Sequence, residues 1–173
     1  MPELAAAGTA NAVDALVWYF AYGSNLCPDT FLGRRAMRPL AARPGRLDGF
    51  RLVFDLPVGP GERGVANVVE DPAASVCGVA YLLTASDAER LDRSEGVHAG
   101  VYRRLPVVVR TPEEGAIAAF TYRSAFGRPG RKPSSHYLRL LLDGARHHRL
   151  PATWIAFLES HPLAVDERLR EPA

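Results

Sequence analysis

Four consecutive residues, Tyr22-Gly23-Ser24-Asn25, join a glycine to small polar side chains directly after an aromatic-rich apolar segment. A turn of this kind, placed between a strand and a helix, can point several backbone N–H groups at one anionic or oxyanionic group. Tyr19 and Tyr22 would add phenolic hydroxyls near the same strand end. The residues therefore indicate either a binding turn or a plain structural turn, and their chemistry alone does not separate the two.

Glu95 is the best candidate for proton transfer. Ser86-x-x-Glu89 has the pattern of a capping box, so we expect a helix that begins there, runs through Leu91 and stops near Gly96. A carboxylate in the last turn of that helix faces the negative end of the helix dipole, which disfavours its ionisation. The expected rise in proton affinity suits a general base near neutral pH, and the alternative is a solvated surface glutamate.

Cys27 follows the turn by two residues and is a candidate thiolate nucleophile. Nucleophilic cysteine catalysis also needs a base, and the sequence does not say whether His98, His136 or another histidine reaches the thiol. A small half-buried thiol is the simpler interpretation. His147-His148 are adjacent on a helix, so their rings point in different directions, and no carboxylate at metal-ligand spacing accompanies them. We predict no metal there.

Six segments rich in β-favouring residues predict the strands that would hold these side chains. They cover residues 17–22, 51–54, 65–70, 76–83, 102–110 and 116–123. Asp71-Pro72 is expected to be the turn between the third and the fourth strand. Six strands in so short a chain favour a barrel or a strongly curved sheet.

Helices are expected in the segments that connect and follow these strands along the chain. Pro28 and Asp29 begin a short helix that reaches about Ala36. Residues 134–148 place their apolar side chains on one helical face, Pro151 ends that helix, and a further short helix follows around residues 154–158.

The length and composition indicate one globular domain with a sizeable core. The chain has 173 residues, of which 47% are hydrophobic and 23% are charged, and this is too apolar for a disordered chain. We expect a single domain over residues 17–160 between flexible tails at 1–16 and 161–173.

Charge, the length of the apolar runs and the cysteine content argue against several classes of protein. There are 21 basic and 19 acidic side chains, and the arginines are scattered, which argues against a nucleic-acid partner. No segment approaches the roughly 18 uninterrupted apolar residues of a membrane span, and the N-terminal segment lacks the basic start of a secretory signal. Cys27 and Cys77 are too few for a disulfide framework, so we expect reduced thiols and a cytoplasmic protein.

Three segments, taken in order, resemble the gamma-glutamylcyclotransferase family, and the likeness covers about residues 17–160. The segments are Tyr19-Phe20-Ala21-Tyr22-Gly23-Ser24-Asn25-Leu26, then Leu91-Asp92-x-x-Glu95-Gly96-Val97 with Tyr102 beyond, then Pro133-Ser134-x-x-Tyr137 leading into Asp143-Gly144-Ala145 and Leu150-Pro151. Branches that act on glutathione or on gamma-glutamylamines look different in the first segment. The sequence is therefore similar to the branch that acts on gamma-glutamyl amino acids.

The resemblance implies an α+β fold, a small mixed β-barrel flanked by helices. It implies Glu95 as the catalytic acid and base. It also implies a set of substrate-binding residues, which are Tyr19, Tyr22, Gly23, Ser24, Asn25, Tyr102 and Tyr137. The implied reaction is of the 5-oxoproline-forming lyase or acyltransferase kind and uses no metal or organic cofactor. Its substrate is a small gamma-glutamyl amino acid, or a gamma-glutamyl-capped amine, whose amine is released.

Two other functions stay open at this point. One is a cysteine-dependent amidohydrolase that uses Cys27 and releases glutamate, and the other is a barrel that binds a gamma-glutamyl ligand without turnover. The identity of the released amine is open, as is the role of the turn, whose amides can bind either the oxyanion or the α-carboxylate. A homodimer is left open on the resemblance alone.

Overall fold

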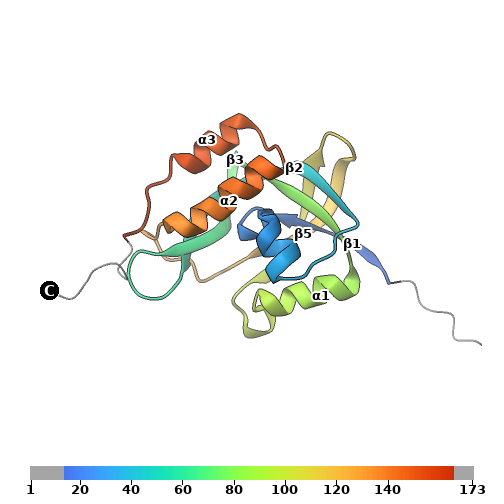
Figure 1. The fold of residues 1–173 in the computed structure, drawn as a ribbon, viewed down its shortest axis with the longest axis horizontal. Coiled ribbons are helices and arrows are strands. Elements are labelled where there is room, and N and C mark those ends of the chain that lie inside the picture. The colour runs from blue at the N-terminus through green and yellow to red at the C-terminus, as the bar shows by residue number, and fades with distance from the viewer. Residues whose placement is uncertain (1–13, 166–173) are drawn as a thin grey trace, which may run out of the picture.

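Five strands close into a barrel because each carries apolar side chains that have to be buried on its inner face. The computed structural model describes residues 14–165, and within them the strand order is β1-β3-β2-β4-β5 (Figure 1). The strands are β1 (Leu16–Ala21), β2 (Ala41–Pro57), β3 (Gly64–Thr84), β4 (Arg103–Thr111) and β5 (Gly115–Arg123). β1 pairs antiparallel with β3 and parallel with β5, so the predicted mixed barrel is confirmed.

Helical segments fill the connections and cover the barrel. Two short segments, Ser24–Leu26 and Asp29–Arg34, follow β1, and α1 (Ala85–Ser94) and a turn at Val97–Ala99 follow β3. After β5 come α2 (Ser135–His147) and α3 (Ala152–Glu159). Figure 1 shows α2 and α3 on one side of the barrel and α1 on the other.

The prediction of two strands around an Asp71-Pro72 turn is wrong. β3 is a single strand of 21 residues that pairs along its length with β2. Asp48 lies opposite Ser75 and Phe50 opposite Glu70, so residues 71–74 bulge out against Gly49 alone. Pro72 is tolerated in this bulge because the bulged residues do not have to donate to the ladder. The six expected strands are therefore five.

The end of α1 lies where the sequence predicts it, but its start does not. Thr84, and not Ser86, caps the helix, because the Thr84 hydroxyl accepts a hydrogen bond from the Asp87 N–H at 3.1 Å. The helix ends at Ser94, Glu95 follows it, and Gly96 takes the left-handed conformation with φ of 69°. Glu95 is therefore fixed at a helix terminus.

α2 packs unusually close to the turn after β1. Its buried side chains include Leu138, Leu141 and Ala145, as the apolar pattern predicts. Gly144 faces Leu26, and a Cβ built on Gly144 would lie 2.4 Å from the Leu26 carbonyl carbon. Only glycine permits this approach, which presses the helix against the turn.

The ends of the chain are described only in part. The tails predicted at residues 1–16 and 161–173 lie largely outside the described residues, so the domain limits of 17–160 stay a prediction. Between residues 14 and 165, no helix is both long enough and apolar enough to span a membrane.

Candidate active site

A cavity opens at the end of β1, where the barrel, α1 and α2 meet. It is lined by Glu95 and by all seven substrate-binding residues that the family resemblance implies, together with Ala66 and Tyr122, which were not expected. The lining residues are Tyr19, Tyr22, Gly23, Ser24, Asn25, Ala66, Glu95, Tyr102, Tyr122 and Tyr137. Segments more than a hundred residues apart in the chain thus share one site, although the roles of the individual residues remain predictions.

The turn after β1 is tightly wound and leaves little space for a side chain at position 23. The Leu26 N–H donates to the Gly23 carbonyl at 3.0 Å, and the Cys27 N–H donates to the Ser24 carbonyl at 3.0 Å. A Cβ on Gly23 would lie 3.2 Å from Tyr137 Oη and 3.3 Å from Ala66 Cβ. The glycine therefore keeps the floor of the cavity open.

Asn25 connects this turn to Glu95. Its Nδ2 donates to Glu95 Oε1 and to Tyr19 Oη, both at 2.9 Å, and the Asn25 side chain is buried. Its Oδ1 is a buried acceptor with no partner among the described residues. A buried polar atom without a partner is uncommon and marks a place where a ligand donor would be favoured.

Glu95 is held through one of its two oxygens. Arg35 Nη2 lies 3.2 Å from the same Oε1 that Asn25 contacts, and the Glu95 side chain is 12% exposed. Within residues 14–165, Oε2 has no protein partner. The carboxylate is thus oriented by two donors and keeps one oxygen for a substrate.

Arg35 is a site residue that the sequence analysis missed. It follows the short helical segment Asp29–Arg34, and its Nη1 donates to Ser94 Oγ at 2.8 Å. Ser94 Oγ in turn donates to the Leu91 carbonyl at 2.8 Å, so the guanidinium ties the end of α1 to the segment after the turn. No spacing signal could have found this contact, since Arg35 and Glu95 are far apart in the chain.

The tyrosines form the wall of the cavity and anchor its backbone. Tyr102 Oη donates to the Ala66 carbonyl at 2.8 Å, and the Ala66 N–H donates to Tyr137 Oη at 3.1 Å. Tyr22 Oη donates to the Tyr122 carbonyl at 2.6 Å. Ala66 takes part in both of its bonds through its backbone groups alone, so its side-chain type does not mark it as a site residue in the sequence.

Burial keeps these phenols neutral. It raises the pKa of Tyr137 to about 12, while hydrogen bonds from the Ala66 and Ser24 backbones act in the opposite direction. Burial also raises the pKa of Tyr19, with Glu95 adding to the shift, and raises the pKa of Tyr102. The wall therefore offers uncharged hydroxyl groups to a ligand at neutral pH.

A second layer supports the turn from behind. Tyr81 Oη lies 3.2 Å from the Asn25 carbonyl oxygen and 2.9 Å from His148 Nε2. Burial and the neighbouring His147 lower the pKa of His148 to about 4, so its imidazole is neutral at pH 7. The end of α2 is thus connected to the backbone of Asn25 through His148 and Tyr81.

The geometry does not favour Cys27 as a nucleophile. Its side chain is buried at 4% exposure and is absent from the lining of the cavity that holds Glu95. His98 and His136, the bases considered for it, are both exposed. The turn positions Asn25 for chemistry and directs the thiol into the packed interior.

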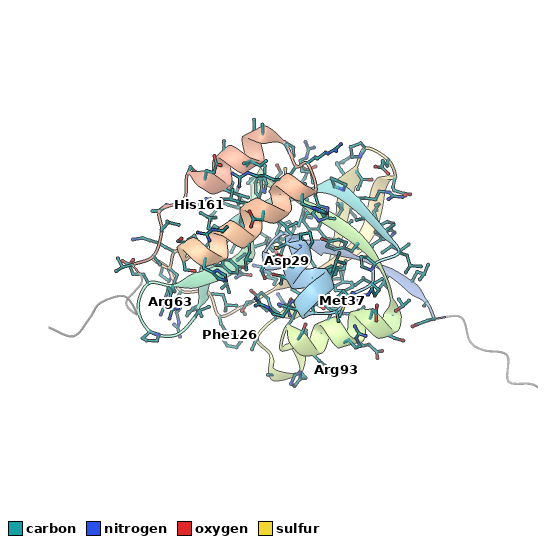
Figure 2. All side chains as sticks on the ribbon, viewed as in Figure 1. Asp29, Met37, Arg63, Arg93, Phe126 and His161 are labelled. Carbon is teal, nitrogen blue, oxygen red and sulfur yellow. The ribbon has the colours of Figure 1, made fainter. Side chains whose placement is uncertain are left out.

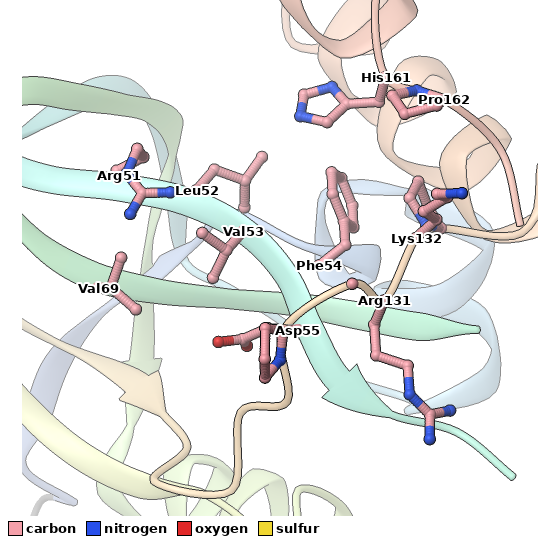
Figure 3. A pocket seen from close by; sticks show the side chains of 13 residues that line it. Arg51, Leu52, Val53, Phe54, Asp55, Val69, Arg131, Lys132, His161 and Pro162 are labelled. Carbon is pink, nitrogen blue, oxygen red and sulfur yellow. The ribbon is translucent and has the colours of Figure 1, made fainter. Parts of the chain in front are cut away.

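A separate pocket lies on another part of the barrel (Figure 3). Its lining includes Phe54, Asp55, Arg131, Lys132 and His161. It contains none of the residues around Glu95, so it is distinct from the candidate site.

Comparisons with known proteins place this barrel in a defined class. The model of the AIG2-like family matches residues 75–158. A solved structure of a gamma-glutamyl cyclotransferase superposes with a TM-score of 0.77 at 25% identity and covers 92% of this chain and 94% of that one. A human protein described as uncharacterized superposes with a TM-score of 0.76 at 28% identity, covering 86% and 89%.

The sequence relatives make the class more specific. The Bos taurus gamma-glutamylcyclotransferase is 32% identical over 146 residues, which are 82% of this chain and 77% of that protein. A gamma-glutamyl cyclotransferase of Aspergillus oryzae is 33% identical over 171 residues, covering 86% and 63%. The chain belongs to the gamma-glutamylcyclotransferase family.

Proposed function

We propose that this protein is an enzyme that converts gamma-glutamyl amino acids to 5-oxoproline and the free amino acid, with Glu95 as general acid and base. One observation carries the proposal. A carboxylate that is mostly buried, oriented by Asn25 and Arg35 through a single oxygen, presents its other oxygen to a cavity walled by neutral tyrosines. Membership of the family supports the same reaction.

The reaction requires few functional groups from the protein, because the substrate supplies both the nucleophile and the electrophile. The α-amine of the substrate attacks its own γ-carbonyl carbon, so nucleophile and electrophile are already tethered and a five-membered lactam closes. The bond between the γ-carbon and the leaving nitrogen then breaks. No covalent enzyme intermediate is needed, and the buried Cys27 has no part in the reaction.

Two proton transfers fall to Glu95. Its carboxylate first takes a proton from the substrate ammonium, which frees the lone pair that attacks. The protonated carboxyl then returns the proton to the departing nitrogen, so Glu95 ends the cycle ionised as it began. The lactam nitrogen gives up its second proton, and the released amine takes up a proton and leaves as the ammonium ion, so the protons balance. Oε2 is the oxygen available for both steps, because Oε1 is held by Asn25 and Arg35.

The remaining groups bind and orient the substrate. The turn at residues 22–25 is suited to an anionic oxygen, either the oxyanion on the γ-carbon or the α-carboxylate. Tyr19, Tyr102 and Tyr137 surround the same space with hydroxyl groups. The unpartnered Asn25 Oδ1 is an acceptor for the substrate ammonium.

Identification of the product tests the reaction class. We expect the purified protein to release 5-oxoproline from gamma-glutamyl-alanine, and mass spectrometry separates this product from glutamate by the mass of one water. The Cys27→Ala variant should retain this activity. Release of glutamate that Cys27→Ala abolishes would instead establish a cysteine hydrolase, and calorimetric binding without product would establish a non-catalytic barrel.

We further propose a cytoplasmic location and a homodimer. The first is supported by two cysteines that are both unpaired. The second rests on the family resemblance alone, and light scattering of the purified protein measures it directly.

A further inference from the structure

A groove runs along the surface beside the cavity. It is lined mainly by Leu56, Pro57, Val101, Phe126, Arg128 and Arg131. The lining thus combines apolar side chains with two guanidinium groups. Figure 2 shows Phe126, which lies in the segment after β5, between Arg63 and Arg93 in that view.

The groove begins at the rim of the cavity. Val101 immediately precedes Tyr102 of the cavity wall, and its N–H donates to the carbonyl of Gly96, the residue after Glu95, at 3.1 Å. A Cβ on Gly96 would lie 3.1 Å from Val101 Cγ2, so the valine packs directly beside this glycine. Val101 therefore lies beside the residue that follows Glu95 and next in the chain to a residue of the cavity wall.

The opposite bank is connected to the cavity through Asp55. Asp55 Oδ1 accepts a hydrogen bond from Asn67 Nδ2 at 3.0 Å, and Asn67 follows Ala66 of the cavity lining. The Asp55 carbonyl accepts from the Arg128 N–H at 2.7 Å, and Leu56 follows Asp55 in the chain. Each bank is therefore joined to a residue that lines the cavity, one bank to Tyr102 through Val101 and the other to Ala66 through Asn67.

The groove exposes apolar side chains, and the backbone that carries Phe126 is anchored by hydrogen bonds. Phe126 is 59% exposed and Val101 is 39% exposed. The Phe126 N–H donates to Ser124 Oγ at 3.2 Å, and the Ser124 N–H donates to Asn67 Oδ1 at 2.9 Å. Phe126 and Val101 thus expose apolar surface in one groove, and the hydrogen bonds that anchor the backbone of Phe126 would lower the ordering cost of binding a ligand there.

The cations of the groove have no acidic partner within residues 14–165. Arg131 Nη1 donates instead to the carbonyls of Gly59 at 3.1 Å and Arg63 at 3.0 Å. Figure 3 shows its guanidinium directed away from His161 and Pro162. Arg128 is exposed and has no side-chain bond to the described residues. A carboxylate is the complementary ligand for such groups.

We propose that this groove binds the leaving part of the substrate and selects gamma-glutamyl amino acids whose released amino acid has an apolar side chain and a free carboxylate. Phe126 and Val101 contact the side chain, and Arg128 binds the carboxylate. The inference rests on the proposed cyclotransferase activity. An uncharged amine would leave the exposed Arg128 guanidinium without a charged partner, so charge complementarity favours an amino acid.

The test compares gamma-glutamyl-leucine with gamma-glutamyl-leucinamide, which lacks the carboxylate. We expect Arg128→Gln to lower kcat/KM for the leucine substrate about tenfold and to leave the leucinamide substrate within twofold. Phe126→Ala should lower kcat/KM for gamma-glutamyl-leucine about tenfold but that for gamma-glutamyl-glycine little. Both effects should lie in KM, because these contacts are the same in substrate and transition state.

Two surface variants serve as controls. Arg139→Gln on α2 removes an exposed arginine, and Leu40→Ala removes an apolar side chain that is 60% exposed. Neither should change the ratio between substrates. If the wild-type protein makes 5-oxoproline but Arg128→Gln and Phe126→Ala leave every ratio unchanged, the groove is not the subsite. If the wild-type protein makes no 5-oxoproline from any substrate, the proposed function itself fails.

Discussion

At the scale of single residues, the site depends on how Glu95 shares its contacts. Asn25 and Arg35 approach the same oxygen at 2.9 Å and 3.2 Å, which fixes the orientation of the carboxylate and leaves Oε2 for the substrate. An isolated surface glutamate would sample several rotamers instead. Orientation, rather than the presence of a carboxylate, separates Glu95 from the other glutamates of the chain.

Arg35 is therefore predicted to be a positioning residue. Arg35→Met should lower kcat about tenfold with little change in KM, because the substrate still binds while Glu95 loses its orientation. Arg35→Lys should recover part of the loss, since a cation remains near Oε1. Steady-state kinetics on gamma-glutamyl-alanine measure both effects. A rise in KM alone, with kcat intact, would assign Arg35 to substrate binding.

Local motifs in the sequence predict only part of the site, and Tyr102 and Tyr137 were expected only from the resemblance to the family. The turn at residues 22–25 and Glu95 stand at element ends that the sequence marks with glycine. Arg35 and Tyr122 reach the site through contacts across the fold, and strand residues such as Tyr122 do not differ in sequence from core residues. Ala66 contributes only its backbone, which no side-chain pattern can report.

At the scale of elements, the close approach of α2 to the turn determines the shape of the cavity. Gly144 allows α2 to touch Leu26, the residue after Asn25, and Tyr81 with His148 supports the Asn25 carbonyl from the same side. The helix therefore acts as a brace for the turn. The boundaries of α2 are also the best predicted in the chain, because Ser134 and Pro151 mark them.

Gly144→Ala should loosen this brace. The new Cβ would lie 2.4 Å from backbone atoms of Leu26, so the helix or the turn has to move, at a cost of about 1–3 kcal/mol in the free energy of unfolding. We expect lower thermal stability and a reduced kcat.

Gly33→Ala is the matched control, because nothing lies within 4 Å of the added Cβ. It should leave stability unchanged or raise it slightly. Equal behaviour of the two variants in thermal unfolding would show that the contact between α2 and the turn does not matter.

The strand boundaries were predicted less well than those of α2. A proline after an aspartate usually marks a turn, yet residues 71–74 form a bulge in a strand that continues to Thr84. Local signals identify where a ladder is interrupted, but only pairing with β2 decides whether the strand ends there. Barrel closure was predictable in kind, whereas the strand count was not.

At the scale of the whole molecule, the barrel brings the turn after β1, the end of α1 and the helix α2 together at the cavity. His148 contributes to this assembly as a neutral side chain, because burial lowers its pKa to about 4. An unfolded histidine has a pKa near 6.5, so between about pH 6.5 and pH 4 the unfolded chain binds more protons than the folded one. Stability from this group is complete above pH 6.5 and is lost as the pH falls through that range.

Acidification from pH 7 to pH 4 should therefore lower the free energy of unfolding by about 1–2 kcal/mol through His148, allowing for its partial exposure. Urea denaturation at several pH values measures the slope. The His148→Gln variant should be less stable at pH 7 and should show a flatter dependence on pH. An unchanged slope in this variant would mean that other groups cause the acid sensitivity.

The most direct measurement of the central claim is the turnover of gamma-glutamyl-alanine by Glu95→Gln, beside Glu89→Gln as a matched change on the exposed face of α1. The account predicts that Glu95→Gln unfolds at the wild-type temperature but forms 5-oxoproline about 10²–10⁴-fold more slowly, while Glu89→Gln is fully active. Formation of 5-oxoproline by Glu95→Gln at the wild-type rate would contradict it.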